Sequence, residues 1–85
     1  MKKVIIYTGP ACNYCDAAKH LLSKKKVDYT EFNIATDPAK LIEMQKKTKG
    51  AKTIPQIFIG ETYVGGYNEL KALEVASKLN SLLEI

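Results

Sequence analysis

The chain is short and basic, with 85 residues, 13 lysines, nine acidic residues and a net charge of +4. Its length predicts one domain over residues 1–85 with a modest core, and no apolar run is long enough to span a bilayer. Arginine is absent, and Met1 leads within a few residues into an apolar strand rather than a signal peptide. We therefore expect a cytoplasmic monomer that has no nucleic-acid or membrane partner.

The sequence pattern predicts alternating strands and helices. Runs rich in Val, Ile and Tyr indicate strands, and apolar residues at helical spacing indicate helices. Gly9 breaks the first strand, while Asp37 and Pro38 supply a cap and a first position for the second helix. The expected ranges are 3–8 (strand), 12–25 (helix), 29–34 (strand), 37–48 (helix), 56–59 and 62–64 (hairpin strands) and 67–83 (helix).

The last helix has the longest apolar pattern of the chain. We expect it to begin at Tyr67 or Asn68, directly after a pair of glycines. Its apolar residues recur at helical spacing, so one continuous helix is expected to reach the end of this pattern. The residues expected to face the core are Leu70, Leu73, Ala76, Leu79 and Leu83.

The order of these elements predicts an α/β fold. A right-handed strand–helix–strand crossover joins the first two strands in parallel. The hairpin over residues 56–64 then adds antiparallel strands. The result is a four-stranded mixed sheet with helices on both faces, in the order β-α-β-α-β-β-α.

The two cysteines of the chain, Cys12 and Cys15, lie at the junction between the first strand and the first helix. Backbone N–H groups and the positive end of the helix dipole lower the pKa of a thiol at this position, which favours Cys12 as the nucleophile. Closing so short a loop removes little chain entropy, so the pair is a poor structural staple. Two Cys and one His do not supply the four ligands of a structural zinc site. Lys19, one turn after Cys15, is placed to help lower a thiol pKa, but we interpret it as a solvated side chain.

Three segments, in this order, resemble the glutaredoxin family: residues 7–15, 53–59 and 65–70. They resemble the active-site loop of the dithiol type, a segment with a cis proline at position 55, and the start of the last helix. The likeness covers nearly the whole chain and implies a thioredoxin-like fold. It also implies a glutathione-dependent thiol–disulfide oxidoreductase with a Cys12/Cys15 dithiol, which reduces protein disulfides and glutathione mixed disulfides.

The same resemblance implies a role for each part of the site. Cys12 attacks, and Cys15 resolves the mixed disulfide. Glutathione is a co-substrate, disulfide-containing or glutathionylated proteins are the partners, and no metal or bound cofactor is implied. The implied glutathione contacts are Tyr14, Lys52, Thr53, Ile54, Pro55, Gly66, Tyr67, Asn68 and Glu69.

Three positions depart from the family pattern. Asn13 stands for proline, Gly9 for lysine and Asn68 for aspartate. The last two departures remove one contact to each end of glutathione, which leaves open a redoxin that is reduced by a thioredoxin-reductase-like flavoenzyme, for example in the service of ribonucleotide reductase. Asn13 leaves open a dimeric carrier of a [2Fe–2S] cluster, ligated by Cys12 and glutathione.

Overall fold

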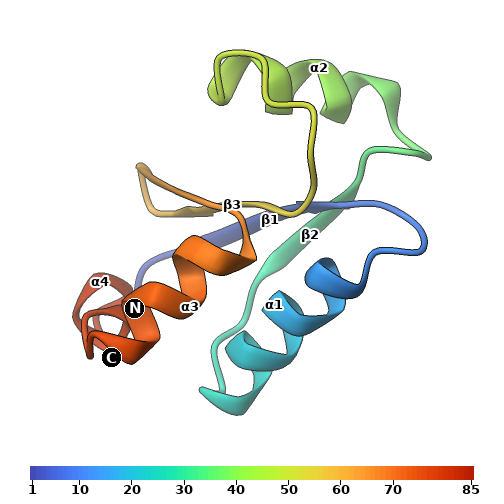
Figure 1. The fold of residues 1–85 in the computed structure, drawn as a ribbon. Helices are drawn as coiled ribbons and strands as arrows, with labels where there is room; N and C mark the ends of the chain where they lie inside the picture. Colours follow the sequence, from blue (N-terminus) through green and yellow to red (C-terminus); the bar gives the residue numbers. More distant parts are fainter.

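A computed structural model describes residues 1–85, with a four-stranded sheet at its centre (Figure 1). The strands are β1 (Val4–Thr8), β2 (Thr30–Asn33), β3 (Gln56–Ile59) and β4 (Thr62–Gly65), in the order β2-β1-β3-β4. β1 pairs parallel with β2 and antiparallel with β3, while β3 and β4 form the antiparallel hairpin. The predicted mixed sheet is therefore confirmed, and its strand ends differ from the expected ones by one residue at most.

Helices cover both faces of this sheet, as predicted (Figure 1). They are α1 (Asn13–Lys24), α2 (Pro38–Lys47), α3 (Tyr67–Val75) and α4 (Leu79–Leu83). α2 lies on one face, and α1 and α3 lie on the other. The arrangement is the thioredoxin-like α/β fold. None of the helices combines the length and the apolar composition that a membrane-spanning helix requires.

The start of α2 forms as the sequence predicts. The Asp37 carboxylate accepts a hydrogen bond from the Lys40 backbone N–H at 3.4 Å, and Pro38 occupies the first helical turn. A cap of this kind satisfies one of the free N–H groups at a helix start, and proline fits there because it has no N–H to lose.

The continuous last helix is a wrong prediction. α3 ends at Val75 with Ala76 as its C-cap, Ser77 adopts a positive φ of 59°, and α4 begins after Lys78. A straight helix over residues 67–83 would be about 25 Å long, whereas a five-residue strand spans about 17 Å, so its end would pass beyond the sheet. The turn directs Leu79 into the core, as expected. It leaves Ala76 exposed, whereas the sequence predicted that Ala76 would face the core.

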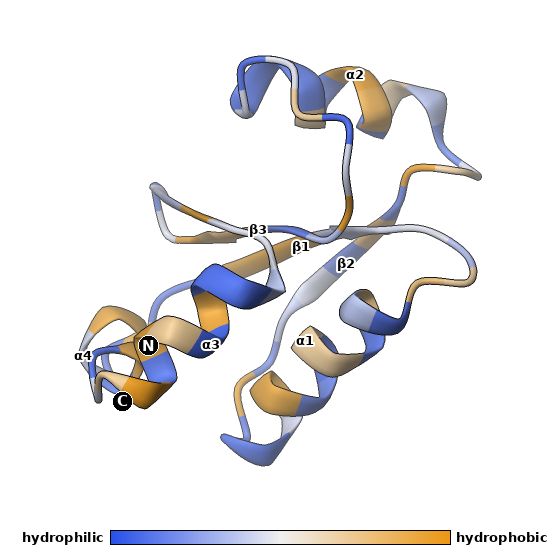
Figure 2. Ribbon diagram, viewed as in Figure 1, coloured by the Kyte–Doolittle hydropathy of each residue, from blue (hydrophilic) through white to orange (hydrophobic).

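Two separate apolar clusters fill the two faces. The larger lies between the sheet and the helices α1, α3 and α4, and Figure 2 shows the apolar residues of β1 and α4 that contribute to it. Its ten buried members are Val4, Ile6, Ala18, Leu22, Val27, Ile57, Ile59, Leu70, Leu79 and Leu83. The smaller cluster, under α2, consists of Tyr7, Met44 and Phe58. Alternation along β1 places Ile6 in the first cluster and Tyr7 in the second.

Candidate active site

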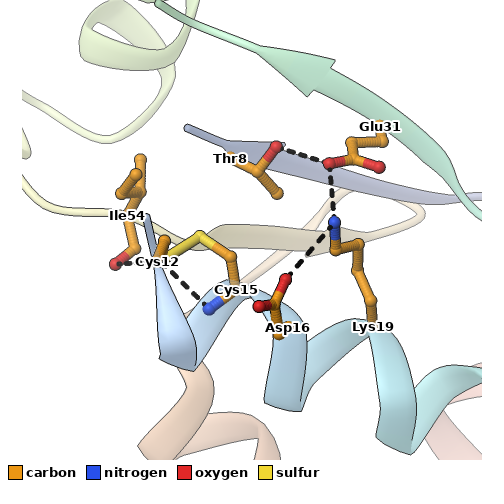
Figure 3. A network of polar contacts seen from close by, with 7 residues as sticks. All are labelled: Thr8, Cys12, Cys15, Asp16, Lys19, Glu31 and Ile54. Carbon is orange, nitrogen blue, oxygen red and sulfur yellow. Dashed lines mark hydrogen bonds and ion pairs between the residues drawn. A yellow bond between two sulfur atoms is a disulfide. The ribbon is translucent and has the colours of Figure 1, made fainter. Parts of the chain in front are cut away.

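The two cysteines form a disulfide at the N-terminus of α1 (Figure 3). Their Cα atoms lie 5.2 Å apart. Cys12 is the N-cap residue, and its Sγ accepts a hydrogen bond from the Cys15 backbone N–H at 3.0 Å. Cys12 is half-buried, while Cys15 is 1% exposed. A thiolate at Cys12 would keep this N–H bond and face the positive end of the helix dipole, which favours Cys12 as the attacking sulfur.

The segment before β3 lies against the Cys12 sulfur. The Ile54 carbonyl oxygen is 3.9 Å from Cys12 Sγ (Figure 3). The Ile54–Pro55 peptide bond is cis, which confirms that prediction. The backbone of this segment therefore borders the position that a substrate sulfur must occupy to react with Cys12.

A pocket of about 270 Å³ opens beside this segment. It lies between the residues before β3, the start of α3 and the exposed ring of Tyr14. Its lining residues are Tyr14, Thr53, Ile54, Pro55, Gly66, Tyr67, Asn68 and Glu69. The structure thus brings together every expected glutathione contact except Lys52, which is exposed and does not line the pocket.

The start of α3 forms one wall of the pocket. The Glu69 carboxylate accepts a hydrogen bond from the Gly66 backbone N–H at 2.7 Å, so this N–H group already has a partner. The N–H groups of the next residues belong to the first turn of α3, where no carbonyl of the helix can bind them. The Tyr14 and Tyr67 rings, which both line the pocket, are stacked with centroids 6.0 Å apart.

Gly9 occupies a position in the site that a larger residue would disturb. A Cβ atom on Gly9 would lie 2.7 Å from Cδ1 of Ile54, which is shorter than a contact between two non-bonded carbon atoms. The Ile54 side chain also packs against the small cluster under α2. The residue three positions before Cys12 and the pocket-lining Ile54 are therefore sterically coupled.

A polar network lies beside the dithiol on the α1 face of the sheet (Figure 3). Glu31 of β2 accepts hydrogen bonds from Thr8 Oγ1 at 2.7 Å and from Lys19 Nζ at 3.0 Å. Lys19 Nζ also lies 3.8 Å from the Asp16 carboxylate. The Thr8 hydrogen bond, with help from Lys19, lowers the pKa of Glu31, and the bond to Glu31 raises the pKa of Lys19.

The sequence interpretation missed this network. Lys19 is an ion-paired side chain rather than a merely solvated one, with 27% of it exposed. Strand alternation could have indicated the network. Glu31 pairs with Ile6 in the register of β1 and β2, so the two side chains lie on the same face of the sheet. That face is the one that α1 covers, so a carboxylate there meets the helix that carries the cysteines.

The fold and the site together define the class of protein. A cysteine pair at the start of a helix, bordered by a segment with a cis proline on this fold, is typical of a thioredoxin-like thiol–disulfide oxidoreductase.

Comparison with known proteins gives the family. The sequence profile described as glutaredoxin matches residues 4–64. A glutaredoxin of Pseudomonas aeruginosa is 48% identical over 83 residues, which cover 98% of each chain. The solution structure of a Brucella melitensis glutaredoxin has a TM-score of 0.83 and 47% identity, over 98% of this chain and 89% of that one. A buckwheat glutaredoxin–glutathione complex shares the fold, with a TM-score of 0.85 at 21% identity over 95% of this chain and 76% of that one. The chain belongs to the glutaredoxin family.

Proposed function

We propose that this oxidoreductase depends on glutathione and reduces both glutathione mixed disulfides and protein disulfides. The observation that carries the proposal is the pocket beside Cys12, because the expected glutathione contacts other than Lys52 converge on it. The buckwheat glutaredoxin, which shares the fold, was solved as a complex with glutathione, and this supports the assignment of the pocket.

In the proposed complex, the cysteinyl part of glutathione lies along Ile54, whose carbonyl borders Cys12 Sγ. An extended ligand pairs with exposed backbone groups in the manner of an added strand. The γ-glutamyl carboxylate meets the first-turn N–H groups of α3, since a helix N-terminus favours an anion. Lys52 lies outside the pocket, and we propose that it reaches the glycyl carboxylate from the rim.

The reaction with a glutathionylated protein needs only Cys12. Its thiolate attacks the glutathione sulfur, a Cys12–glutathione disulfide forms, and the protein thiolate leaves and takes up a proton. A second glutathione thiolate then attacks the adduct, which releases glutathione disulfide and restores the Cys12 thiolate.

The reaction with a protein disulfide needs both cysteines. Cys12 attacks one substrate sulfur and forms a mixed disulfide. Cys15 then attacks Cys12 Sγ, loses its proton and releases the substrate as a dithiol. The Cys12–Cys15 disulfide that results is reduced by two glutathione molecules, which leave as glutathione disulfide.

A coupled assay with glutathione, glutathione reductase and NADPH tests the proposal. Wild type should reduce a glutathionylated peptide and a protein disulfide, Cys15→Ser should retain only the first activity, and Cys12→Ser should lose both. Turnover with a thioredoxin-reductase-like flavoenzyme but not with glutathione would contradict the proposal and favour the alternative redoxin. The monomeric state, the cytoplasmic location and the cluster alternative stay predictions from the sequence.

A further inference from the structure

Two opposite charges are held together beside the dithiol. Lys19 follows Cys15 by four residues on α1, and side chains at this spacing lie one above the other with Cβ atoms about 6 Å apart. The carboxylate of Glu31 reaches the Lys19 ammonium from β2, and Figure 3 shows both beside the disulfide. Cys12, where a thiolate is expected, precedes Lys19 by seven residues, which is about 10 Å along the helix and about one Debye length at 0.1 M salt. A charge on Cys12 is therefore within electrostatic range of this pair.

Reduction of the disulfide creates such a charge. The oxidised pair is neutral. Addition of two electrons and one proton gives the Cys12 thiolate and the Cys15 thiol, so the reduced site carries one more negative charge. Positive charges nearby stabilise the reduced form and raise the reduction potential, and negative charges lower it.

The Lys19 ammonium alone would favour the reduced form, as the N-terminus of α1 already does. The Glu31 carboxylate lies 3.0 Å from Lys19 Nζ, and its negative charge offsets the contribution of the lysine. The Asp16 carboxylate lies farther from Lys19 Nζ, at 3.8 Å, and its side chain is 76% exposed, so water screens most of its effect. On α3, the Glu69 carboxylate is bound to the Gly66 N–H group. Glu31 is therefore the anion that balances Lys19.

We propose that Glu31 is a tuning residue, which neutralises Lys19 and so keeps the Cys12–Cys15 couple more reducing than the helix end and the lysine alone would make it. Thr8 is a positioning residue in the same device. It is 1% exposed and its hydroxyl group fixes the carboxylate next to Lys19. The biological meaning rests on the proposed function, because a couple that donates electrons to substrates benefits from a low potential.

The test is a redox titration of the full chain against dithiothreitol at pH 7 and 0.1 M salt, with the dithiol fraction measured by alkylation and mass spectrometry. Dithiothreitol bypasses the glutathione pocket, so the result is independent of the proposed co-substrate. Glu31→Gln should shift the equilibrium toward the dithiol by about three- to tenfold, which is roughly 15–30 mV. Lys19→Met should shift it in the opposite direction, and the double variant should lie near wild type.

The other end of α1 provides a matched control. Lys25 Nζ lies 2.8 Å from Glu74, whose exposure of 33% resembles the 36% of Glu31. Glu74→Gln breaks the same kind of ion pair about 20 Å along the helix from Cys12, so the potential should not move. At 1 M salt the Glu31→Gln shift should shrink, because the Debye length falls from about 10 Å to about 3 Å. A Glu31→Gln shift no larger than that of Glu74→Gln, of the opposite sign, or unaffected by salt overturns the proposal.

Discussion

The two faces of the sheet hold their helices by different means. Under α1, α3 and α4 the contacts come from ten buried apolar residues. Under α2 a cluster of three is bordered by charged side chains, with Lys40 Nζ 4.0 Å from the Phe32 ring centroid and Lys47 Nζ 4.2 Å from that of Phe58. Apolar burial stabilises in proportion to area, whereas aromatic and charged contacts depend on geometry. The first face therefore provides most of the stability, and the second fixes the position of α2 and of the segment that leads to Ile54.

The largest expected effect compares one buried residue from each face. Leu22→Ala should lower the free energy of unfolding by about 2–5 kcal/mol, toward the upper end, because the surrounding cluster leaves little room to collapse. Met44→Ala should lie at the lower end of this range, since the smaller cluster borders flexible side chains. Urea denaturation of both variants measures the difference. An equal or larger loss for Met44→Ala would remove the distinction between the faces.

The next effect concerns the polar anchor of α2. The buried Tyr7 hydroxyl donates to Glu43, and Tyr7→Phe should cost about 1–2 kcal/mol of unfolding free energy. Burial and the Glu43 carboxylate raise the pKa of Tyr7, and the Tyr7 hydrogen bond lowers the pKa of Glu43.

These two shifts give a pH signature for the same variant. The lowered pKa of Glu43 stabilises wild type above about pH 4.3, and this contribution is lost as the pH falls through the folded value. The raised pKa of Tyr7 stabilises wild type below about pH 10, and this part is lost as the pH rises further. The stability profile of Tyr7→Phe should therefore be flatter at both extremes. Parallel profiles for the two proteins would contradict the link between this hydrogen bond and the two pKa shifts.

A smaller effect tests whether the α2 face supports the active site. Gly9→Ala should displace the Ile54 side chain at a cost of about 0.5–1.5 kcal/mol, which is two- to tenfold in kcat/KM for a glutathionylated peptide. Ile54→Val removes the Cδ1 atom that the new Cβ meets, so the effect of Gly9→Ala should be much smaller in that background. The same effect in both backgrounds would show that the two residues act independently.

The smallest effect concerns a single cation. Lys47→Met removes the ammonium group that lies above Phe58 and 3.4 Å from the Tyr7 hydroxyl oxygen, and it should lower the unfolding free energy by about 0.5–1 kcal/mol. Lys46→Met changes a neighbouring exposed lysine on the same helix and serves as the control. Thermal unfolding of the two variants at equal ionic strength distinguishes a specific ring contact from a general change in net charge.

Sequence reasoning predicted the elements whose signals are local. Asp37 and Pro38 mark the start of α2, and the cysteine pair marks the start of α1, because caps and first-turn residues act within a few positions. The pocket residues came from resemblance, and the topology brings them together because β3 lies beside β1 at the centre of the sheet.

The missed features depend on contacts distant in sequence. The apolar spacing from Leu70 to Leu83 contains no sign of a break, and the turn at Ser77 returns Leu79 and Leu83 to a core formed by distant parts of the chain. The Thr8–Glu31 bond joins two strands through their register, which a single sequence does not specify in detail. Lys52 precedes a pocket-lining segment in sequence, yet adjacency in the chain does not direct a side chain into the cavity.

The Cys12–Cys15 disulfide also links reduction to thermal stability. Cys12 and Cys15 are three residues apart, so the cross-link restricts the unfolded chain very little. Reduction and unfolding form a closed thermodynamic cycle. The unfolding free energy of the reduced protein therefore exceeds that of the oxidised protein by nF(Ef − Eu), where Ef and Eu are the reduction potentials of the disulfide in the folded and in the unfolded chain. Every contact that favours the folded thiolate must therefore raise the melting temperature of the reduced protein relative to the oxidised one. Calorimetry of the two forms, with no redox buffer present, would rank variants of this chain by their potential.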